Sequence, residues 1–230
     1  LASSAASDVY KRQDLGIVVD PDVDRLALIS ENGEMFGEEY TLVAVADYVL
    51  KHTPGNTVSN LSSSRALKDV TEAYGQQYHA AAVGEVNVVA EMKRTHSVIG
   101  GEGNGGVIYP ESHYGRDALV GVGLFLSHYV AQSKKMTELK STYPPYFISK
   151  NKMTLSPDMD VDKILEGLKE RYATEKVTDI DGVKIDFAQG WVHLRKSNTE
   201  PIIRIYSEAK DEAAANQLAE EVIAAAKSTL

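Results

Sequence analysis

The sequence predicts an α/β protein in which one complete α/β domain with a mixed sheet is followed by a small α+β domain. Strand-like and helix-like segments alternate over the first part of the chain, a proline pair at 144–145 interrupts them, and hairpin-type patterning follows. The 230 residues, 43% hydrophobic and 25% charged, suffice for a buried core and for one or two domains.

Residues 1–13 are small and polar and have neither a strand nor a helix period. Asp14 then leads directly into the apolar run 15–19, and a second apolar run follows at 26–29. Because a strand so close to the start of the chain has lost its sheet neighbours, we expect residues 1–13 to be a non-native or disordered leader. The strand itself would come from the interior of a longer protein.

Residues 33–143 are predicted to form the complete α/β domain, after a hairpin-type turn at Asn32-Gly33. The elements expected in order are a helix at 40–51, a strand at 57–61, a helix capped by Ser64 and ending at Gly75, a strand at 78–83, a helix at 87–95, a strand at 97–99 and a helix at 117–133. This alternation over about a hundred residues is typical of one α/β domain.

Residues 144–230 are predicted to form the α+β domain, because adjacent prolines continue neither a helix nor a central strand. The elements expected here are a helix at 161–172, a hairpin around Asp181-Gly182, strands at 191–194 and 202–206, and an amphipathic helix at 211–227. An antiparallel sheet covered by two helices accounts for this pattern.

Composition excludes several classes of partner. The formal charge of −9 and the pI near 5.2 argue against nucleic acid and against an anionic membrane, since both bind basic surfaces. The chain has no cysteine, which excludes disulfides and thiolate metal sites and favours a cytoplasmic location. It also has no run of 18 apolar residues.

Asp20, Asp22 and Asp24 alternate immediately after the first apolar run and predict a loop that holds a divalent cation such as Mg²⁺. The alternative without a metal is an exposed turn, which Pro and Asp also favour. An EF-hand calcium loop would place Glu31 at its twelfth position, but its sixth position requires Gly and is Arg25. A phosphatase with an aspartate nucleophile lacks a downstream Lys or Thr that the sequence identifies.

The segment Arg195-Lys196-Ser197-Asn198-Thr199-Glu200-Pro201 lies between two predicted strands. An arginine, two hydroxyls, an amide and the backbone N–H groups of a turn are suited to a phosphate dianion. The alternative is an ordinary polar hairpin loop.

The segment 100–106 has five glycines around Glu102 and Asn104. Glycine lets the backbone approach a ligand closely, and a carboxylate and an amide are suited to sugar hydroxyls. The spacing of a dinucleotide-binding loop starts at Gly101, but no helix pattern begins there. A flexible loop without a ligand is the alternative.

Together the three loops resemble the C-terminal portion of the α-D-phosphohexomutase family, which comprises phosphoglucomutases, phosphomannomutases and phosphoglucosamine mutases. The matching motifs, in the family's order, are DPDVDR at 20–25, GEGNGG at 101–106 and RKSNTEP at 195–201, and the segments 62–65 and 83–87 fit as well. The similarity extends from Asp14 to about the end of the chain.

The resemblance implies a protein of four domains, in which a serine of the first domain carries a phosphoryl group. Residues 14–32 would be the tail of the metal-loop domain, 33–143 the sugar-binding domain and 144–230 the phosphate-binding domain, with the preceding domains of the same protein as partners. The enzyme would interconvert a hexose 1-phosphate and 6-phosphate through a bisphosphate. The residue roles implied are Mg²⁺ ligation by Asp20, Asp22 and Asp24, stabilisation of the transferring phosphoryl group by Arg25, contact with sugar hydroxyls by Glu102 and Asn104, and binding of the other phosphate by Arg195, Ser197, Asn198 and Thr199.

The chain departs from the family pattern at three places. Many relatives have Met-Ser-Gly-His after the Glu of the sugar loop where this chain has 103–106, and many have His after Val-Gly where it has Glu85. The Gly-Asn-Gly-Gly version resembles that of phosphoglucosamine-mutase-like relatives. No segment of the form Thr-Ala-Ser-His-Asn-Pro is present, so we expect the chain alone to be inactive.

Two other functions stay open at this point. One is a phosphosugar-binding module without catalytic activity, and the other is a calcium-binding structural protein. Among the remaining polar residues, His113 and Arg116 follow the sugar loop closely enough to line a cleft. His79 and His193, like His113, have no metal-type spacing and are interpreted as surface or core residues.

Overall fold

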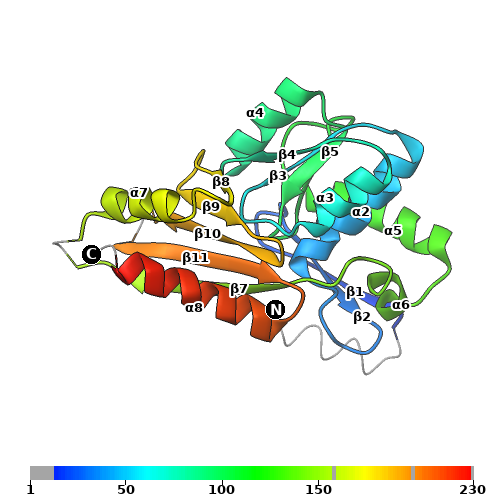
Figure 1. The fold of residues 1–230 in the computed structure, drawn as a ribbon. Helices are drawn as coiled ribbons and strands as arrows, with labels where there is room; N and C mark the ends of the chain where they lie inside the picture. The colour runs from blue at the N-terminus through cyan, green and yellow to red at the C-terminus, as the bar shows by residue number, and fades with distance from the viewer. Residues whose placement is uncertain (1–12, 157–158, 198–199, 229–230) are drawn as a thin grey trace. The chain divides into compact units, whose positions relative to one another are not determined.

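The computed structural model describes residues 13–156, 159–197 and 200–228. The chain divides into two compact units, Leu1–Pro144 and Pro145–Leu230 (Figure 1). The prediction placed this boundary one residue earlier, between 143 and 144. No helix in the described part of the chain is long and apolar enough to cross a membrane.

The first unit contains a four-stranded mixed sheet with the order β4-β3-β5-β6. Its elements are α2 (Glu38–His52), β3 (Thr57–Asn60), α3 (Ala66–Ala73), β4 (Tyr78–Ala81), α4 (Glu85–Thr95), β5 (Ile99–Glu102), β6 (Gly106–Ile108), α5 (Ala118–Gln132) and α6 (Met136–Lys140). β3 pairs in parallel with both β4 and β5, whereas β6 is antiparallel to β5. The carboxyl ends of three parallel strands therefore meet at one edge.

Helices pack on both faces of this sheet (Figure 1). Successive residues of β5 show the two layers, because Gly100 faces Met92 of α4 and Gly101 faces Leu42 of α2. α2 is buried around most of its circumference, since it packs against α3, α5 and β5 as well as β2.

Before this sheet, β1 (Leu15–Val19) and β2 (Leu26–Ser30) form a separate two-stranded antiparallel sheet. The acidic loop 20–25 joins them. Leu26 and Leu28 of β2 are fully buried, and β2 packs against α2 and α5. The acidic loop is thereby held against the first unit.

The second unit is a five-stranded antiparallel sheet with the order β7-β11-β10-β9-β8. Its strands are β7 (Phe147–Thr154), β8 (Lys176–Thr178), β9 (Val183–Asp186), β10 (Gly190–Lys196) and β11 (Ile202–Ala209). The helices α7 (Val161–Arg171) and α8 (Glu212–Ser228) share one core with Val192, Leu194 and Ile203 of the sheet. Figure 1 shows α8, in red, running along β11 and β7.

The predicted fold class is confirmed: a mixed α/β unit is followed by an antiparallel sheet covered by two helices. The strand expected at 97–99 was placed too early, since β5 begins at Ile99 and continues into the glycine-rich segment. Three short or polar elements were missed, namely α6, β6 and β7, whereas the hairpin expected around Asp181-Gly182 is formed by β8 and β9. β7 was not predicted because it is an edge strand. Its exposed lysines at 150 and 152 leave too few apolar residues to show a strand period.

Candidate functional site

The acidic loop folds back on Asp20. Its Oδ1 accepts hydrogen bonds from the backbone N–H groups of Asp24 and Arg25, both at 3.2 Å, and Val23 has a left-handed backbone (φ 56°) that permits the turn. Burial acts to raise the pKa of Asp20, but the backbone N–H groups of Arg25 and Asp24, the side chain of Asp24 and the charge of Arg25 together outweigh it, so this pKa is lowered. Asp20 is thus held as an anion that points into its own loop.

Asp24 has two differently placed carboxylate oxygens. Oδ2 accepts a hydrogen bond from Nη2 of Arg116 at 2.5 Å, whereas Oδ1 is buried and accepts no hydrogen bond among the described residues. Burial and the neighbouring Asp20 raise the pKa of Asp24, against the lowering effect of Arg116. An orphaned carboxylate oxygen beside a second carboxylate is what a hard cation would satisfy.

Asp22 and Arg25 are both exposed. Nε of Arg25 lies 3.8 Å from Oδ2 of Asp20 and from Oδ1 of Asp24, which leaves the guanidinium at the surface of the loop. Within the described ranges no three acidic or histidine side chains are arranged to hold a metal ion. Asp20 and Asp24 are neighbouring carboxylates with the chemistry that a hard cation requires, and cation binding by them and by Asp22 stays a prediction.

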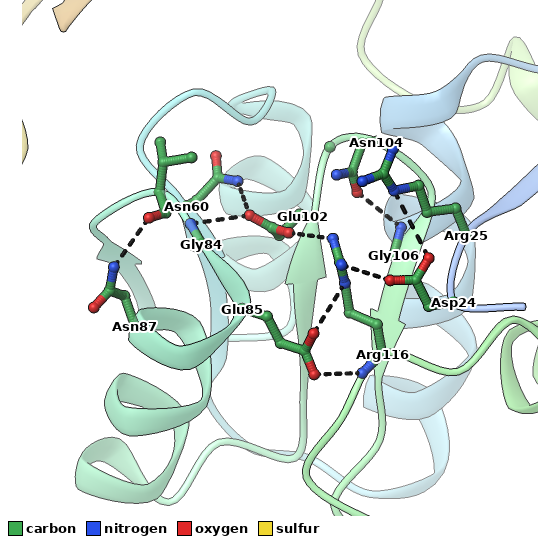
Figure 2. A network of polar contacts seen from close by, with 12 residues as sticks. Asp24, Arg25, Asn60, Gly84, Glu85, Asn87, Glu102, Asn104, Gly106 and Arg116 are labelled. Carbon is green, nitrogen blue, oxygen red and sulfur yellow. Dashed lines mark hydrogen bonds and ion pairs between the residues drawn. The ribbon is translucent and has the colours of Figure 1, made fainter. Parts of the chain in front are cut away.

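Glu102 lies at the carboxyl end of β5, where it is only 4% exposed. Its Oε1 accepts hydrogen bonds from Nδ2 of Asn60 at 2.8 Å and from the backbone N–H of Gly84 at 3.1 Å. Its Oε2 accepts from Nη1 of Arg116 at 2.7 Å (Figure 2). Asn60 ends β3 and Gly84 precedes α4, so the parallel strands bring these groups to one edge.

The glycine-rich turn 103–105 needs glycine at two positions. A Cβ at Gly103 would collide with the carboxylate of Glu39, and one at Gly105 (φ +86°) would collide with the carbonyl oxygen of Leu26. The N–H of Leu26 in turn donates to the carbonyl of Gly105 at 3.0 Å. The turn is therefore attached to the first residue of β2, directly after the acidic loop.

Asn104 is partly buried at the centre of this turn. Its Oδ1 accepts a hydrogen bond from the N–H of Gly106 at 3.2 Å, a local bond that shapes the turn. This side chain lies in the turn that follows Glu102, and its contact with a sugar stays a prediction.

Arg116 brings the two loops together. Besides its contacts with Asp24 and Glu102, its Nε lies 3.3 Å from Oε2 of Glu85, and its backbone N–H donates to Oε1 of Glu85 at 3.1 Å. Just beyond it, the N–H of Ala118 donates to the carbonyl of Val23 in the acidic loop. The sequence placed Arg116 near a cleft but did not indicate these three partners, and it did not single out Asn60.

In the second unit, Arg195 lies near the end of β10, is partly buried and pairs across the sheet with Arg204 of β11. Ser197 is 6% exposed, and its N–H donates to the carbonyl of Ile202 at 3.0 Å. Asn198 and Thr199 lie outside the described residues. The segment predicted to bind phosphate thus begins at the end of β10, which contains Arg195, and Ser197 follows directly after the strand.

Two family models match most of the chain. One, described as the alpha/beta/alpha domain III of phosphoglucomutase/phosphomannomutase, matches residues 37–146, and the C-terminal domain of the same family matches residues 150–225. A phosphoglucomutase/phosphomannomutase of Thermococcus kodakarensis is 37% identical over 90% of this chain, and a phosphoglucosamine/phosphogalactosamine mutase of Sulfurisphaera tokodaii is 33% identical over 91%. These matches cover 46% and 47% of the two relatives, so the chain spans about half their length.

Solved structures show the same fold. A phosphoglucomutase/phosphomannomutase family protein from Burkholderia thailandensis superposes with a TM-score of 0.82 at 22% identity, over 100% of this chain and 50% of its own. An Aspergillus fumigatus N-acetylphosphoglucosamine mutase, solved with GlcNAc-6P and magnesium, gives a TM-score of 0.65 at 14% identity, over 96% of this chain and 56% of its own.

Proposed function

This chain belongs to the phosphoglucomutase/phosphomannomutase family, the α-D-phosphohexomutases, and we propose that it is the C-terminal portion of a mutase that interconverts a hexose 1-phosphate and a hexose 6-phosphate. The reaction would pass through a bisphosphate and use a phosphoserine from a preceding domain. The relatives that it matches are about twice as long, which supports the proposal that preceding domains supply the phosphoserine. A cytoplasmic location is part of the proposal and is supported by the cysteine-free composition.

One observation carries the proposal: the acidic loop and Glu102 share a single arginine. Asp24 and Glu102 are far apart in the sequence, yet each accepts a hydrogen bond from the guanidinium of Arg116 (Figure 2). The loop proposed for Mg²⁺ and the residue proposed for the sugar are therefore neighbours in space. A phosphosugar whose reacting phosphate meets the acidic loop would present its hydroxyls close to Glu102.

In this proposal Asp20 and Asp24, with Asp22, hold Mg²⁺. When bound, the ion would supply positive charge beside the oxygens of the phosphoryl group being transferred. Arg25, exposed on the same loop, adds a guanidinium for those oxygens. Phosphoryl transfer depends mainly on positioning and on neutralising oxygen charge, and these residues would contribute to both.

Glu102 retains the capacity to bind a hydroxyl. A carboxylate can accept about four hydrogen bonds, and Glu102 accepts three in this structure. Its orientation is set by those three bonds before any ligand arrives, which lowers the entropic cost of binding. Asn104 would add a second polar contact from the adjoining turn.

The phosphate that does not react would bind at Arg195, Ser197, Asn198 and Thr199. Since the bisphosphate must present each end in turn, this loop has to accept the ligand in two orientations. An arginine and hydroxyl donors can hold a phosphate without recognising which carbon carries it. Glucosamine, glucose and mannose phosphates all remain candidate substrates, and activity of the full-length reading frame on the three would identify the preferred one.

The test of the proposal is calorimetric titration of the 230-residue chain with glucose 1,6-bisphosphate in the presence of Mg²⁺. We expect the wild-type chain to bind, and Arg195→Ala to bind at least about tenfold more weakly, because it loses a charged phosphate donor. Arg171→Ala is the matched control: it removes the same charge from an exposed residue of α7 that bonds to Ser228, and should leave the affinity unchanged. Equal affinities of wild type and Arg195→Ala would contradict the phosphate role.

The alternative is a phosphosugar-binding module without catalysis. Such a module would bind glucose 1,6-bisphosphate in the same way but would not catalyse the mutase reaction. If a longer reading frame upstream of Asp14 encodes further α/β domains but no active serine loop, the alternative is favoured. Mutase activity of that longer protein favours the enzyme.

A further inference from the structure

We propose that Arg116 is a positioning residue that competes with the divalent cation for Asp24 and couples the cation site to Glu102. The inference rests on the proposed function, because it assigns the acidic loop to a cation and Glu102 to the sugar. It adds a residue that belongs to none of the three loops and predicts how the chain behaves before the cation binds.

The guanidinium of Arg116 is surrounded by carboxylates from three elements (Figure 2). Nη2 contacts Asp24 of the acidic loop at 2.5 Å, Nη1 contacts Glu102 of β5 at 2.7 Å, and Nε lies 3.3 Å from Glu85 of α4. The Arg116 side chain is 14% exposed, so these contacts are largely shielded from water. Three carboxylates around one guanidinium leave two formal negative charges, and the neighbouring pair of Asp20 and Arg25 adds no net charge to them.

The side chain of Arg116 also fills the space next to Gly106 of the glycine-rich segment. A Cβ at Gly106 would lie 2.5 Å from Cδ of Arg116, closer than a real side chain tolerates. Glu85 contacts Arg116 as well, so this arginine lies between the glycine-rich segment and the first residue of α4.

The competition between Arg116 and the cation follows from the contacts of the two carboxylate oxygens of Asp24. Oδ2 is engaged by Arg116 and Oδ1 is buried without a hydrogen bond among the described residues. A cation bound at Oδ1 would partly neutralise the carboxylate of Asp24 and repel the guanidinium. The ion pair between Arg116 and Asp24 would then weaken, and Arg116 would keep its contacts with Glu85 and Glu102. Because such coupling is reciprocal, a ligand that draws Arg116 toward Glu102 makes Asp24 more available to the cation.

The experiment compares wild type, Arg116→Gln and Arg116→Lys as 230-residue chains, by calorimetric titration with Mg²⁺ and by thermal unfolding with and without Mg²⁺. We expect Arg116→Gln to bind Mg²⁺ about fivefold or more tightly than wild type, since a competing positive charge is gone. Without Mg²⁺ its Tm should fall, because the carboxylates repel one another, and Mg²⁺ should raise its Tm by more than it raises that of wild type. Arg116→Lys keeps the charge but not the planar fork and should be intermediate.

Arg94→Gln is the control, since Arg94 is an exposed arginine of the same unit that pairs with Glu91. It should leave the Mg²⁺ affinity unchanged. A purely structural role for Arg116 predicts weaker or unchanged Mg²⁺ binding in Arg116→Gln, and either result overturns the proposal. If Arg116→Gln does not fold even with Mg²⁺, an Arg116→Lys affinity equal to that of wild type overturns it instead.

Failure of the proposed function gives a different result. In that case wild type itself binds neither Mg²⁺ nor glucose 1,6-bisphosphate, and both proposals fall. Wild-type binding of both ligands with no effect of Arg116 overturns only the role of Arg116.

Discussion

His193 shows at the scale of a single residue how burial changes acid–base behaviour. It lies in β10, is 1% exposed, and its Nε2 donates to the carbonyl of Asp181 at 2.7 Å. Burial lowers the pKa of His193 to about 4. The hydrogen bond to Asp181 opposes this shift, and the positive charge of Lys184 adds to it. The imidazole is thus neutral in the folded protein at neutral pH.

This pKa predicts an acid-sensitive contribution to the stability of the second unit. The unfolded chain takes up the proton near pH 6.5 and the folded protein only near 4, so stability from His193 is lost as the pH falls through that window. The loss reaches about 3 kcal/mol by linkage. Urea unfolding of wild type and His193→Gln between pH 7 and pH 4 measures it. The difference between the two should shrink with falling pH, and parallel curves would contradict the prediction.

At the scale of elements, backbone contacts hold the acidic loop beside the glycine-rich turn. The N–H of Leu26 donates to Gly105, and the N–H of Gly103 donates to Oγ of Ser63 at 2.9 Å. The turn is thereby connected to β2 on one side and to the loop after β3 on the other. Its glycines are needed for this close approach rather than for flexibility.

Gly105→Ala should therefore lower the free energy of unfolding by about 2 kcal/mol or more, since it combines a left-handed backbone with a collision at Leu26. The Mg²⁺ affinity should weaken as well, because Gly105 is hydrogen-bonded to Leu26, the residue that directly follows the acidic loop. Gly123→Ala is the matched control. Gly123 is an exposed residue of α5 with no atom within 4 Å of a new Cβ, so alanine should stabilise the helix by about 0.5 to 1 kcal/mol. Equal losses in the two variants, measured by urea unfolding, would refute this interpretation.

At the scale of the whole molecule, the second unit has a hydrophobic core of its own. Leu168 of α7 is fully buried there against residues of α8 and of the sheet, among them Val192 and Ile205. The first unit has separate buried clusters, such as that of Val58 and Met92. Each unit thus has the apolar interior that a domain requires.

Leu168→Ala should lower the stability of the second unit by about 2 to 5 kcal/mol, through lost apolar burial and the cavity it creates. Hydrogen exchange would show the effect as reduced amide protection in β9, β10 and β11, with protection in α2 and β3 retained. Leu119→Ala, at a position 66% exposed, should change protection nowhere by more than about 0.5 kcal/mol. Equal loss of protection in both units would mean that they unfold as one.

The elements that could be predicted from the sequence are those with a local apolar period. The helix predicted at 40–51 is α2 at 38–52, and that predicted at 117–133 is α5 at 118–132, because a 3.6-residue apolar period needs no information from elsewhere in the chain. β6 and β7 were missed, since a three-residue strand or an edge strand is defined by the strand it pairs with.

The sequence also predicted residue types for the proposed site: carboxylates for a cation, Glu102 in a glycine-rich segment, and an arginine loop for phosphate. Which of these groups contact one another is visible only in the folded chain. The fold leaves Asp22 exposed, buries Glu102, and joins Asp24, Glu85 and Glu102 through Arg116. The physical reason is that hydrogen bonds and ion pairs act over about 3 Å, and which residues come that close depends on the path of the whole chain. A local pattern specifies residue types and faces, and the fold specifies partners.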